Sequence, residues 1–144
     1  MTRKGLIFEE PPAKGLGFPE TYLIPISDLG LPNRALNTTI GARLTLTGEL
    51  STMTDPDLLR IRGFGPLSLA DVKEALDVHG AGRLYDDSNE AWEEFLAKGE
   101  KWRAFLARYQ KSGRPGAKAF AETRRYDPAD VRAFYAEIIA VSQG

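Results

Sequence analysis

The 144-residue chain has no cysteine, one histidine and only two methionines. Without cysteine it can form neither a disulfide framework nor a thiolate metal site. The single histidine, His79, excludes His-rich metal sites and most catalytic triads built on histidine. No spacing along the chain suggests a nucleophile next to a base. We therefore expect a protein that is not an enzyme and that has neither a metal nor another cofactor.

Long apolar runs are also missing. No stretch reaches the length of a membrane span, and no long apolar region of a signal peptide follows Met1–Lys4. A hydrophobic content of 42% nevertheless suits a globular protein with a core. We expect a soluble, cytoplasmic protein without a membrane partner.

The net charge is only −1, but it is unevenly distributed. Residues 98–125 hold nine basic and two acidic side chains, whereas residues 81–97 hold one basic and five acidic ones. The acidic cluster is typical of a helix N-terminus or of a partner for the basic segment. In the basic segment, Lys111, Arg114 and Lys118 are candidates for secondary contacts to DNA phosphates. The alternative is that they form the solvated face of packed helices.

Proline, glycine and apolar spacing indicate an arm followed by two helical regions. Residues 1–27 are rich in proline and glycine, which predicts an N-terminal arm with a short extended run at Tyr22–Ile26. Residues 28–80 have apolar residues at helical spacing and no alternating strand pattern. The expected helices there run from Leu31 to Ile40, over Thr47–Ser51, from Thr54 to Gly63, and from Pro66 or Ser68 to Gly80.

After a linker at 81–87, residues 88–144 read as a helical C-terminal region with a basic patch. Ser88 is a cap signal, and the long helix after it has an apolar stripe. The stripe consists of Trp92, Phe95, Leu96, Trp102, Phe105, Leu106 and Tyr109. After a loop at 111–116, further helices are expected over 117–125 and from Asp127 to about Val141. The chain is thus predicted to be all-α, and the C-terminal region either packs on residues 28–80 or stands beside them.

The turn Gly63-Phe64-Gly65 is a candidate binding site. Its two glycines allow positive φ and close approach of a ligand, and Phe64 can anchor the turn by burying its ring. The next helix presents free N–H groups suited to an anion, and Ser68 adds a hydroxyl. The alternative is a tight turn between two helices without a ligand. On an earlier helix, Arg34 and Asn37 share one face at i, i+3 spacing, where they either bind nucleic acid or form solvated surface.

Residues 28–76 resemble a known family. The shared pattern is Asp28-Leu29-x-Leu31, Arg34-x-x-Asn37, Gly48-Glu49-Leu50, Leu58-Leu59, Gly65-x-x-Ser68-Leu69 and Lys73-x-x-Leu76. This pattern is similar to the C-terminal domain of the bacterial RNA polymerase α subunit, over about a third of the chain. The resemblance implies a compact helix-hairpin-helix domain over residues 28–80. It also implies binding to AT-rich double-stranded DNA through the minor groove, and contacts with activators and sigma factor.

The resemblance assigns the minor-groove arginine to Arg34 and its asparagine partner to Asn37, and it places the hairpin contacts at Gly65 and Ser68 beside Gly63. Leu67 departs from the pattern, because the family usually has a phosphate-contacting lysine there. A leucine at this point also suits a protein interface. Because only 27 residues precede the resemblance, we expect a stand-alone protein rather than the polymerase subunit.

The function predicted from these features is DNA binding in transcription and its regulation, in the cytoplasm at the nucleoid. The alternative is a protein-interaction module that docks on RNA polymerase, sigma or an activator. A further alternative is an accessory role in DNA repair or replication, where helix-hairpin-helix elements recur.

Overall fold

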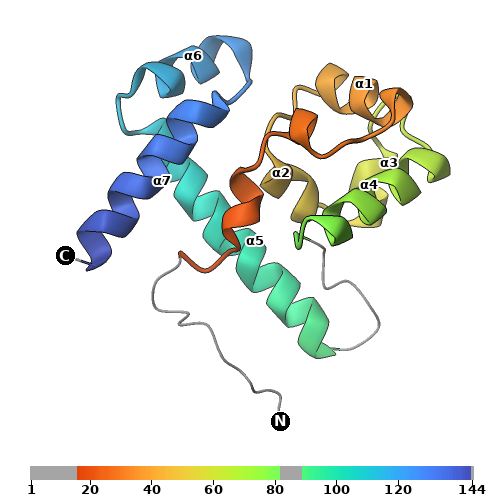
Figure 1. Cartoon of the computed structure of the whole chain (residues 1–144), viewed down its shortest axis with the longest axis horizontal. Coiled ribbons are helices and arrows are strands. Elements are labelled where there is room, and N and C mark those ends of the chain that lie inside the picture. Colours follow the sequence, from red (N-terminus) through yellow and green to blue (C-terminus); the bar gives the residue numbers. More distant parts are fainter. Residues whose placement is uncertain (1–15, 82–88, 144) are drawn as a thin grey trace.

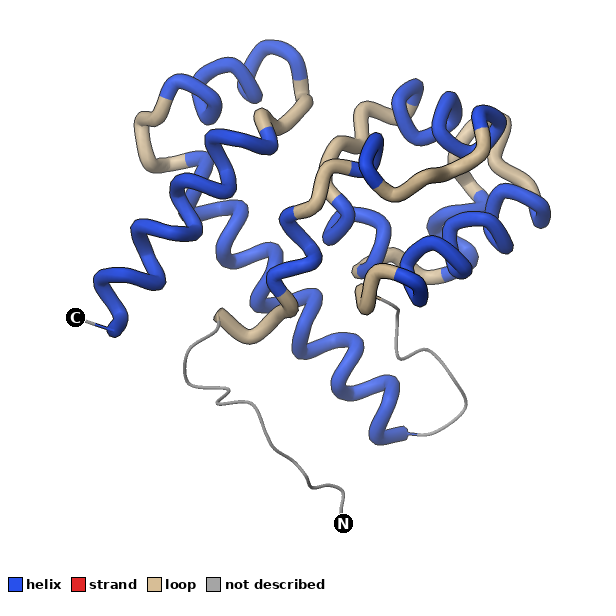
Figure 2. Tube along the Cα trace, viewed as in Figure 1, coloured by secondary structure: helices blue, strands red, loops and turns tan. Residues whose placement is uncertain are grey.

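The computed structural model describes residues 16–81 and 89–143, which are mainly helical. Within the two ranges there is no strand, only an isolated β-bridge between Pro25 and Leu46 (Figure 2). The helices are the 3-10 helices η3 (Glu20–Leu23) and η4 (Ile26–Asp28) and the α-helices α1 (Asn33–Gly41), α2 (Thr47–Ser51), α3 (Asp55–Leu59), α4 (Pro66–Val78), α5 (Asn89–Gln110), α6 (Pro115–Thr123) and α7 (Pro128–Gln143). The all-α prediction is confirmed, while the cap predicted at Ser88 lies outside the described residues.

Helices α1 to α4 follow the predicted punctuation with one exception. Thr54, where this helix was predicted to begin, caps α3: its Oγ1 accepts the Asp57 N–H at 3.2 Å and its own N–H donates to the Asp57 carboxylate at 3.3 Å. However, α3 ends at Leu59 and not at Gly63. The chain then turns through Ile61 and Phe64 before α4 begins at Pro66, where the missing N–H costs nothing.

The extended run predicted at Tyr22–Ile26 is wrong. Tyr22 and Leu23 belong to η3, and Ile26 begins η4. An isolated extended segment would leave its backbone groups without partners, apart from the one bridge to Leu46. The 3-10 turns satisfy those groups locally and bury Tyr22 and Leu23 to 3% and 1% exposure. Burial of the segment therefore comes from its side chains packing on neighbouring helices.

The C-terminal region forms three helices, of which α5 is the long one predicted. The predicted loop at 111–116 is shorter than expected, because α6 starts at Pro115 with Arg114 as its N-cap residue. Of the apolar stripe on α5, Trp102, Phe105 and Tyr109 are buried, whereas Trp92 and Leu96 are 38% and 46% exposed. Figure 1 shows α5 crossing behind η3 near its middle, with α6 and α7 towards its C-terminal end.

The C-terminal region packs on the first part of the chain instead of standing beside it. Trp102 of α5 meets Phe18 and Tyr22 edge-on, with ring centroids 5.1 and 5.5 Å apart. Gly48 of α2 also lies so close to this ring that an added Cβ would be 2.6 Å from the indole. The two parts therefore share one hydrophobic core. Domain boundaries at 28, 80 and 88 stay a prediction.

Among the described residues, none of the helices combines the length and the apolar character that a membrane crossing requires.

Candidate nucleic-acid interface

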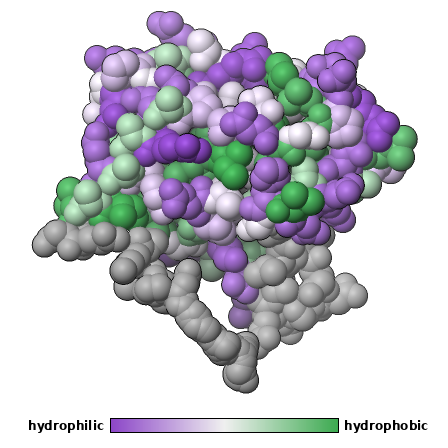
Figure 3. Space-filling model, viewed as in Figure 1, coloured by the Kyte–Doolittle hydropathy of each residue, from purple (hydrophilic) through white to green (hydrophobic). Residues whose placement is uncertain are grey.

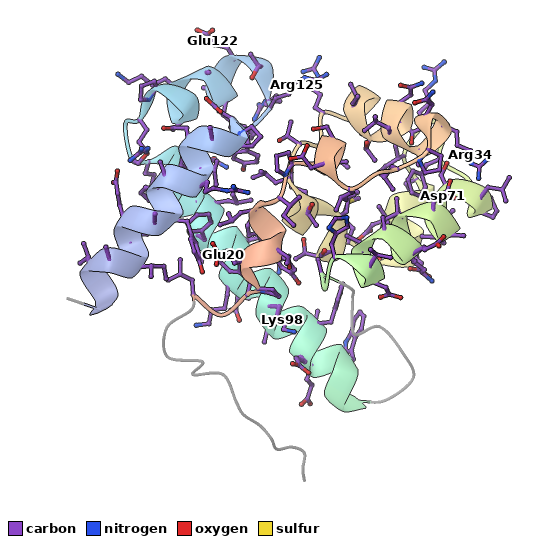
Figure 4. All side chains as sticks on the ribbon, viewed as in Figure 1. Glu20, Arg34, Asp71, Lys98, Glu122 and Arg125 are labelled. Carbon is purple, nitrogen blue, oxygen red and sulfur yellow. The ribbon has the colours of Figure 1, made fainter. Side chains whose placement is uncertain are left out.

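Arg34 lies at the start of α1 and is held by Asp71 of α4. The Nε of Arg34 donates to Asp71 Oδ2 at 2.9 Å, and Nη2 donates to Oδ1 at 3.3 Å. Figure 4 shows the two side chains pointing toward each other. The arginine side chain is 56% exposed and the aspartate 14%, so the carboxylate lies behind the guanidinium and not in front of it. This fork fixes the guanidinium plane while one of its edges faces solvent.

Asn37 lies one turn further along α1, on the same exposed face as Arg34. It borders an open hollow of about 320 Å³ between α1 and the segment that follows α3. The hollow is lined by Asn37, Thr38, Gly41, Ala42, Ile61 and Arg62. The Asn37 amide borders this space from α1, and the exposed Arg62 borders it from the segment after α3. The hollow is therefore lined by hydrogen-bond donors and by one amide acceptor.

The turn between α3 and α4 sits directly against α1. Gly63 has φ +83°, and a Cβ added there would be 3.2 Å from Thr38 Cγ2. Phe64 is 5% exposed and anchors the turn, as predicted. Gly65, in contrast, has φ −122° and ψ −169°, which any residue adopts, and an added Cβ would contact nothing. The expectation that both glycines provide positive φ therefore holds only for Gly63.

The N-terminus of α4 presents backbone and apolar groups more than side-chain donors. The first N–H groups of a helix have no acceptor within it, and Pro66 removes one of them, which leaves those of Leu67 and Ser68. Ser68 as a whole residue is only 4% exposed, so neither its hydroxyl nor its N–H is open to solvent to any large extent. Leu67 is 66% exposed at the tip. The hairpin tip thus offers an anion chiefly the N–H of the exposed Leu67, with the N–H of the buried Ser68 behind it.

The secondary candidates Lys111, Arg114 and Lys118 lie apart from this surface. Figure 1 shows α6 and the turn before it on the opposite side of the molecule from α4. Lys111 and Lys118 are exposed. Arg114 is not free: it donates to Asp130 at 3.1 Å and to Glu137 at 3.0 Å, and its side chain is 22% exposed. Its position fits a clamp between α6 and α7.

Asp130 is the centre of that clamp. It accepts hydrogen bonds from the Tyr109 hydroxyl at 2.7 Å, from Arg114 and from the Gly116 N–H at 3.2 Å. Burial alone would raise the pKa of Asp130, but these three donors outweigh it and hold the pKa below its usual value. The group thus stays ionised and ties α5, α6 and α7 together.

Two contributors were missed by sequence reasoning. Asp71 holds Arg34 from 37 residues away, and no local pattern signals such a pairing. Arg125, at the turn between α6 and α7, donates to the Ile40 carbonyl at the end of α1 over a separation of 85 residues. Among the described residues, no group of three or more histidine or acidic side chains is arranged to hold a metal ion.

Comparisons with known proteins bear on residues 18–78. The family model for the C-terminal domain of the bacterial RNA polymerase alpha chain matches these residues. The DNA-directed RNA polymerase subunit alpha of Bifidobacterium longum is 42% identical over 57 residues, which are 40% of this chain and 17% of that protein. This chain therefore spans less than a fifth of the length of that curated relative. No solved structure gives a significant match.

The family match begins ten residues before Asp28, at Phe18. Phe18, Tyr22 and Leu23 are buried in the core that α1 to α4 also line, so this earlier start agrees with the packing. The resemblance predicted from the sequence is confirmed: residues 18–78 are similar to the C-terminal domain of the bacterial RNA polymerase alpha subunit, and the rest of the protein lies outside that match.

Proposed function

We propose that this protein binds double-stranded DNA in transcription, through the face formed by α1 and the turn before α4. The proposed role is non-catalytic, and its place is the bacterial cytoplasm, at the nucleoid. The observation that carries the proposal is the exposed Arg34 guanidinium, fixed from behind by Asp71 and adjacent to Asn37 and the Gly63 turn.

The geometry suits a minor groove. A narrow A·T-rich minor groove has an enhanced negative potential that favours an inserted arginine. The fork with Asp71 spares Arg34 part of the cost of ordering a long side chain, because its guanidinium is already oriented. The N–H groups of Leu67 and Ser68 then face a neighbouring phosphate at a helix N-terminus. Preference for AT-rich DNA follows from the groove width and not from a base-specific contact.

The proposal is tested by fluorescence anisotropy with AT-rich and GC-rich duplexes of equal length at low salt. The wild type should bind the AT-rich duplex more tightly, and Arg34→Ala should remove most of the binding. Arg103→Ala is the matched control, because it removes one exposed cation from α5. Absence of binding by the wild type, or equal losses for Arg34→Ala and the control, would reject the proposal.

A second candidate function is docking on a protein of the transcription machinery, such as RNA polymerase, sigma or an activator. The exposed Leu67 at the tip favours it, because an exposed leucine gains from burial against a partner and offers nothing to a phosphate. On the face seen in Figure 3, however, apolar residues form separate patches among hydrophilic ones. Recovery of polymerase subunits after nuclease treatment, lost in Leu67→Asp, would support docking over DNA binding.

A further inference from the structure

A basic corner at the end of α1 is built jointly by the two parts of the chain. We define it as Arg43, Arg124 and Arg125. The Ile40 carbonyl accepts both the Arg43 N–H at 2.9 Å and the Arg125 Nη2 at 3.0 Å, so the two residues meet at one atom. Figure 4 shows Arg125 reaching from the turn after α6 toward α1. Arg124 precedes it in the same turn.

The turn that carries Arg124 and Arg125 is firmly attached. Thr123 Oγ1 accepts the Arg125 N–H at 3.1 Å, and the Tyr126 N–H donates to Thr45 Oγ1 at 3.2 Å. Phe120 and Tyr126 stack behind the turn with ring centroids 4.2 Å apart. The corner is therefore a fixed feature of the fold. Its position depends on α6 and α7, which lie outside the family match.

Arg43 and Arg124 have an unusual backbone for arginine. Their φ angles are +65° and +62°, in the left-handed region that glycine adopts most easily. Both follow the last turn of a helix, where glycine is the commonest residue. Two helices thus end at the same corner with an exposed arginine where glycine would be less strained. Sparsely populated backbone conformations of this kind cluster at functional sites.

The charges of this corner are not neutralised internally. Among the described residues, no carboxylate lies within 4.0 Å of Arg43, Arg124 or Arg125, in contrast to Arg34, Arg60 and Arg114, which have acidic partners. Arg125 is partly buried as a cap of α1, whereas Arg43 and Arg124 are exposed. The hollow beside Asn37 is also lined by Ala42, the residue directly before Arg43. The corner hence continues the candidate interface along α1.

We propose that this corner is a second DNA contact, in which Arg43 and Arg124 bind backbone phosphates and Arg125 positions the turn. The inference rests on the proposed function. The nine residues of α1 span about 13 Å, roughly twice the width of a minor groove. With Arg34 in the groove, the opposite end of α1 falls on the flanking sugar–phosphate backbone. The region after α4 would thereby supply affinity for DNA without adding base readout.

The test replaces Arg43 and Arg124 by glycine, singly and together, in the full-length protein. Glycine is compatible with both φ angles, so the melting temperature should stay the same or rise, and a binding defect is not a folding defect. Duplex affinity should fall severalfold in the double variant. The slope of log K against log salt should flatten by about 0.9 for each phosphate that the protein no longer binds. Lysine at both positions should restore the slope, since it keeps the charge.

Three outcomes decide the matter. A flattened slope in the glycine variants and a normal slope in Arg103→Ala would support the second contact. Unchanged affinity and slope in the double variant, while Arg34→Ala abolishes binding, would overturn the inference and leave the proposed function standing. If the wild type binds no duplex at low salt, the proposed function and the inference fail together.

Discussion

Substitution of Gly48 by alanine should destabilise the protein although it favours the helix locally. Gly48 lies within α2, where alanine is favoured over glycine by about 1 kcal/mol. The added methyl group, however, would be 2.6, 2.7 and 2.9 Å from Cε2, Cζ2 and Cη2 of Trp102. Real Cβ atoms do not approach other atoms so closely, so either the ring or α2 has to move.

The surroundings of Trp102 leave the ring little room to move. It is 1% exposed and is in contact with Phe18, Tyr22 and Phe105, with ring centroids 5.1 to 5.9 Å away. Overpacking a core costs about 1–3 kcal/mol, and the rigid, enclosed indole places this case in the upper part of that range. After subtraction of the helix-propensity gain, the net loss in the free energy of unfolding is about 1–2 kcal/mol.

Urea unfolding measures this free energy, and a double-mutant cycle assigns it to the contact. In a Trp102→Phe background the three indole atoms are absent, so Gly48→Ala should become neutral or stabilising. The effect of Gly48→Ala on the free energy of unfolding should thus change from a loss in the wild-type background to no change or a gain in the Trp102→Phe background. If Gly48→Ala is as stable as the wild type, or equally destabilising in both backgrounds, Gly48 of α2 does not pack closely against Trp102 of α5.

Further predictions concern the candidate interface and the C-terminal clamp. Leu67→Lys should tighten binding to duplex DNA and steepen the salt slope by about 0.9, because it adds a cation beside the helix N-terminus at an exposed position; an unchanged slope would mean that no phosphate lies there. Asp71→Ala should weaken binding despite removing a negative charge, because Arg34 loses its orientation. The cost in stability should stay at about 1 kcal/mol, because the guanidinium is exposed although the carboxylate is only 14% exposed. Tighter binding would show that Asp71 competes with DNA. The pKa of Asp130 is lowered in the folded protein, so its stabilisation is complete above its unfolded pKa of about 3.9 and is lost as the pH falls through the folded value. Urea unfolding should therefore show that the free energy of unfolding falls less between about pH 6 and pH 3 in Asp130→Asn than in the wild type. The same fall in both proteins would contradict this.

The start and stop signals of individual helices were readable from the sequence. Thr54 and Pro56 mark the beginning of α3, and Pro66 opens α4, because capping and proline act within one turn of the backbone. The early end of α3 at Leu59 was not readable, since both Gly63 and the residues before it permit a turn. The path of residues 20–28 was misread, because the apolar run there looks the same whether it packs as a strand or as 3-10 turns.

The candidate site was predicted in part. Arg34, Asn37 and Gly63 could be named from the sequence, and the structure brings them together on one side of α1. Their surroundings could not be named. The pairing of Arg34 with Asp71 and the capping of α1 by Arg125 join residues far apart in the sequence. Such contacts depend on how the helices pack, which single-sequence periodicity does not specify.

DNA binding through α1 and the turn before α4 can be tested by titrating the 15N-labelled protein with an AT-rich duplex and following the backbone amide chemical shifts. We expect the largest shift changes along one continuous surface, at Arg34, Asn37, Gly63, Leu67 and Ser68, and then at Arg43 and Arg124. Amides on the exposed side of α5 should be unaffected. Changes centred on α5 or α7, or none at a duplex concentration that saturates other DNA-binding domains, would show that this surface does not bind DNA.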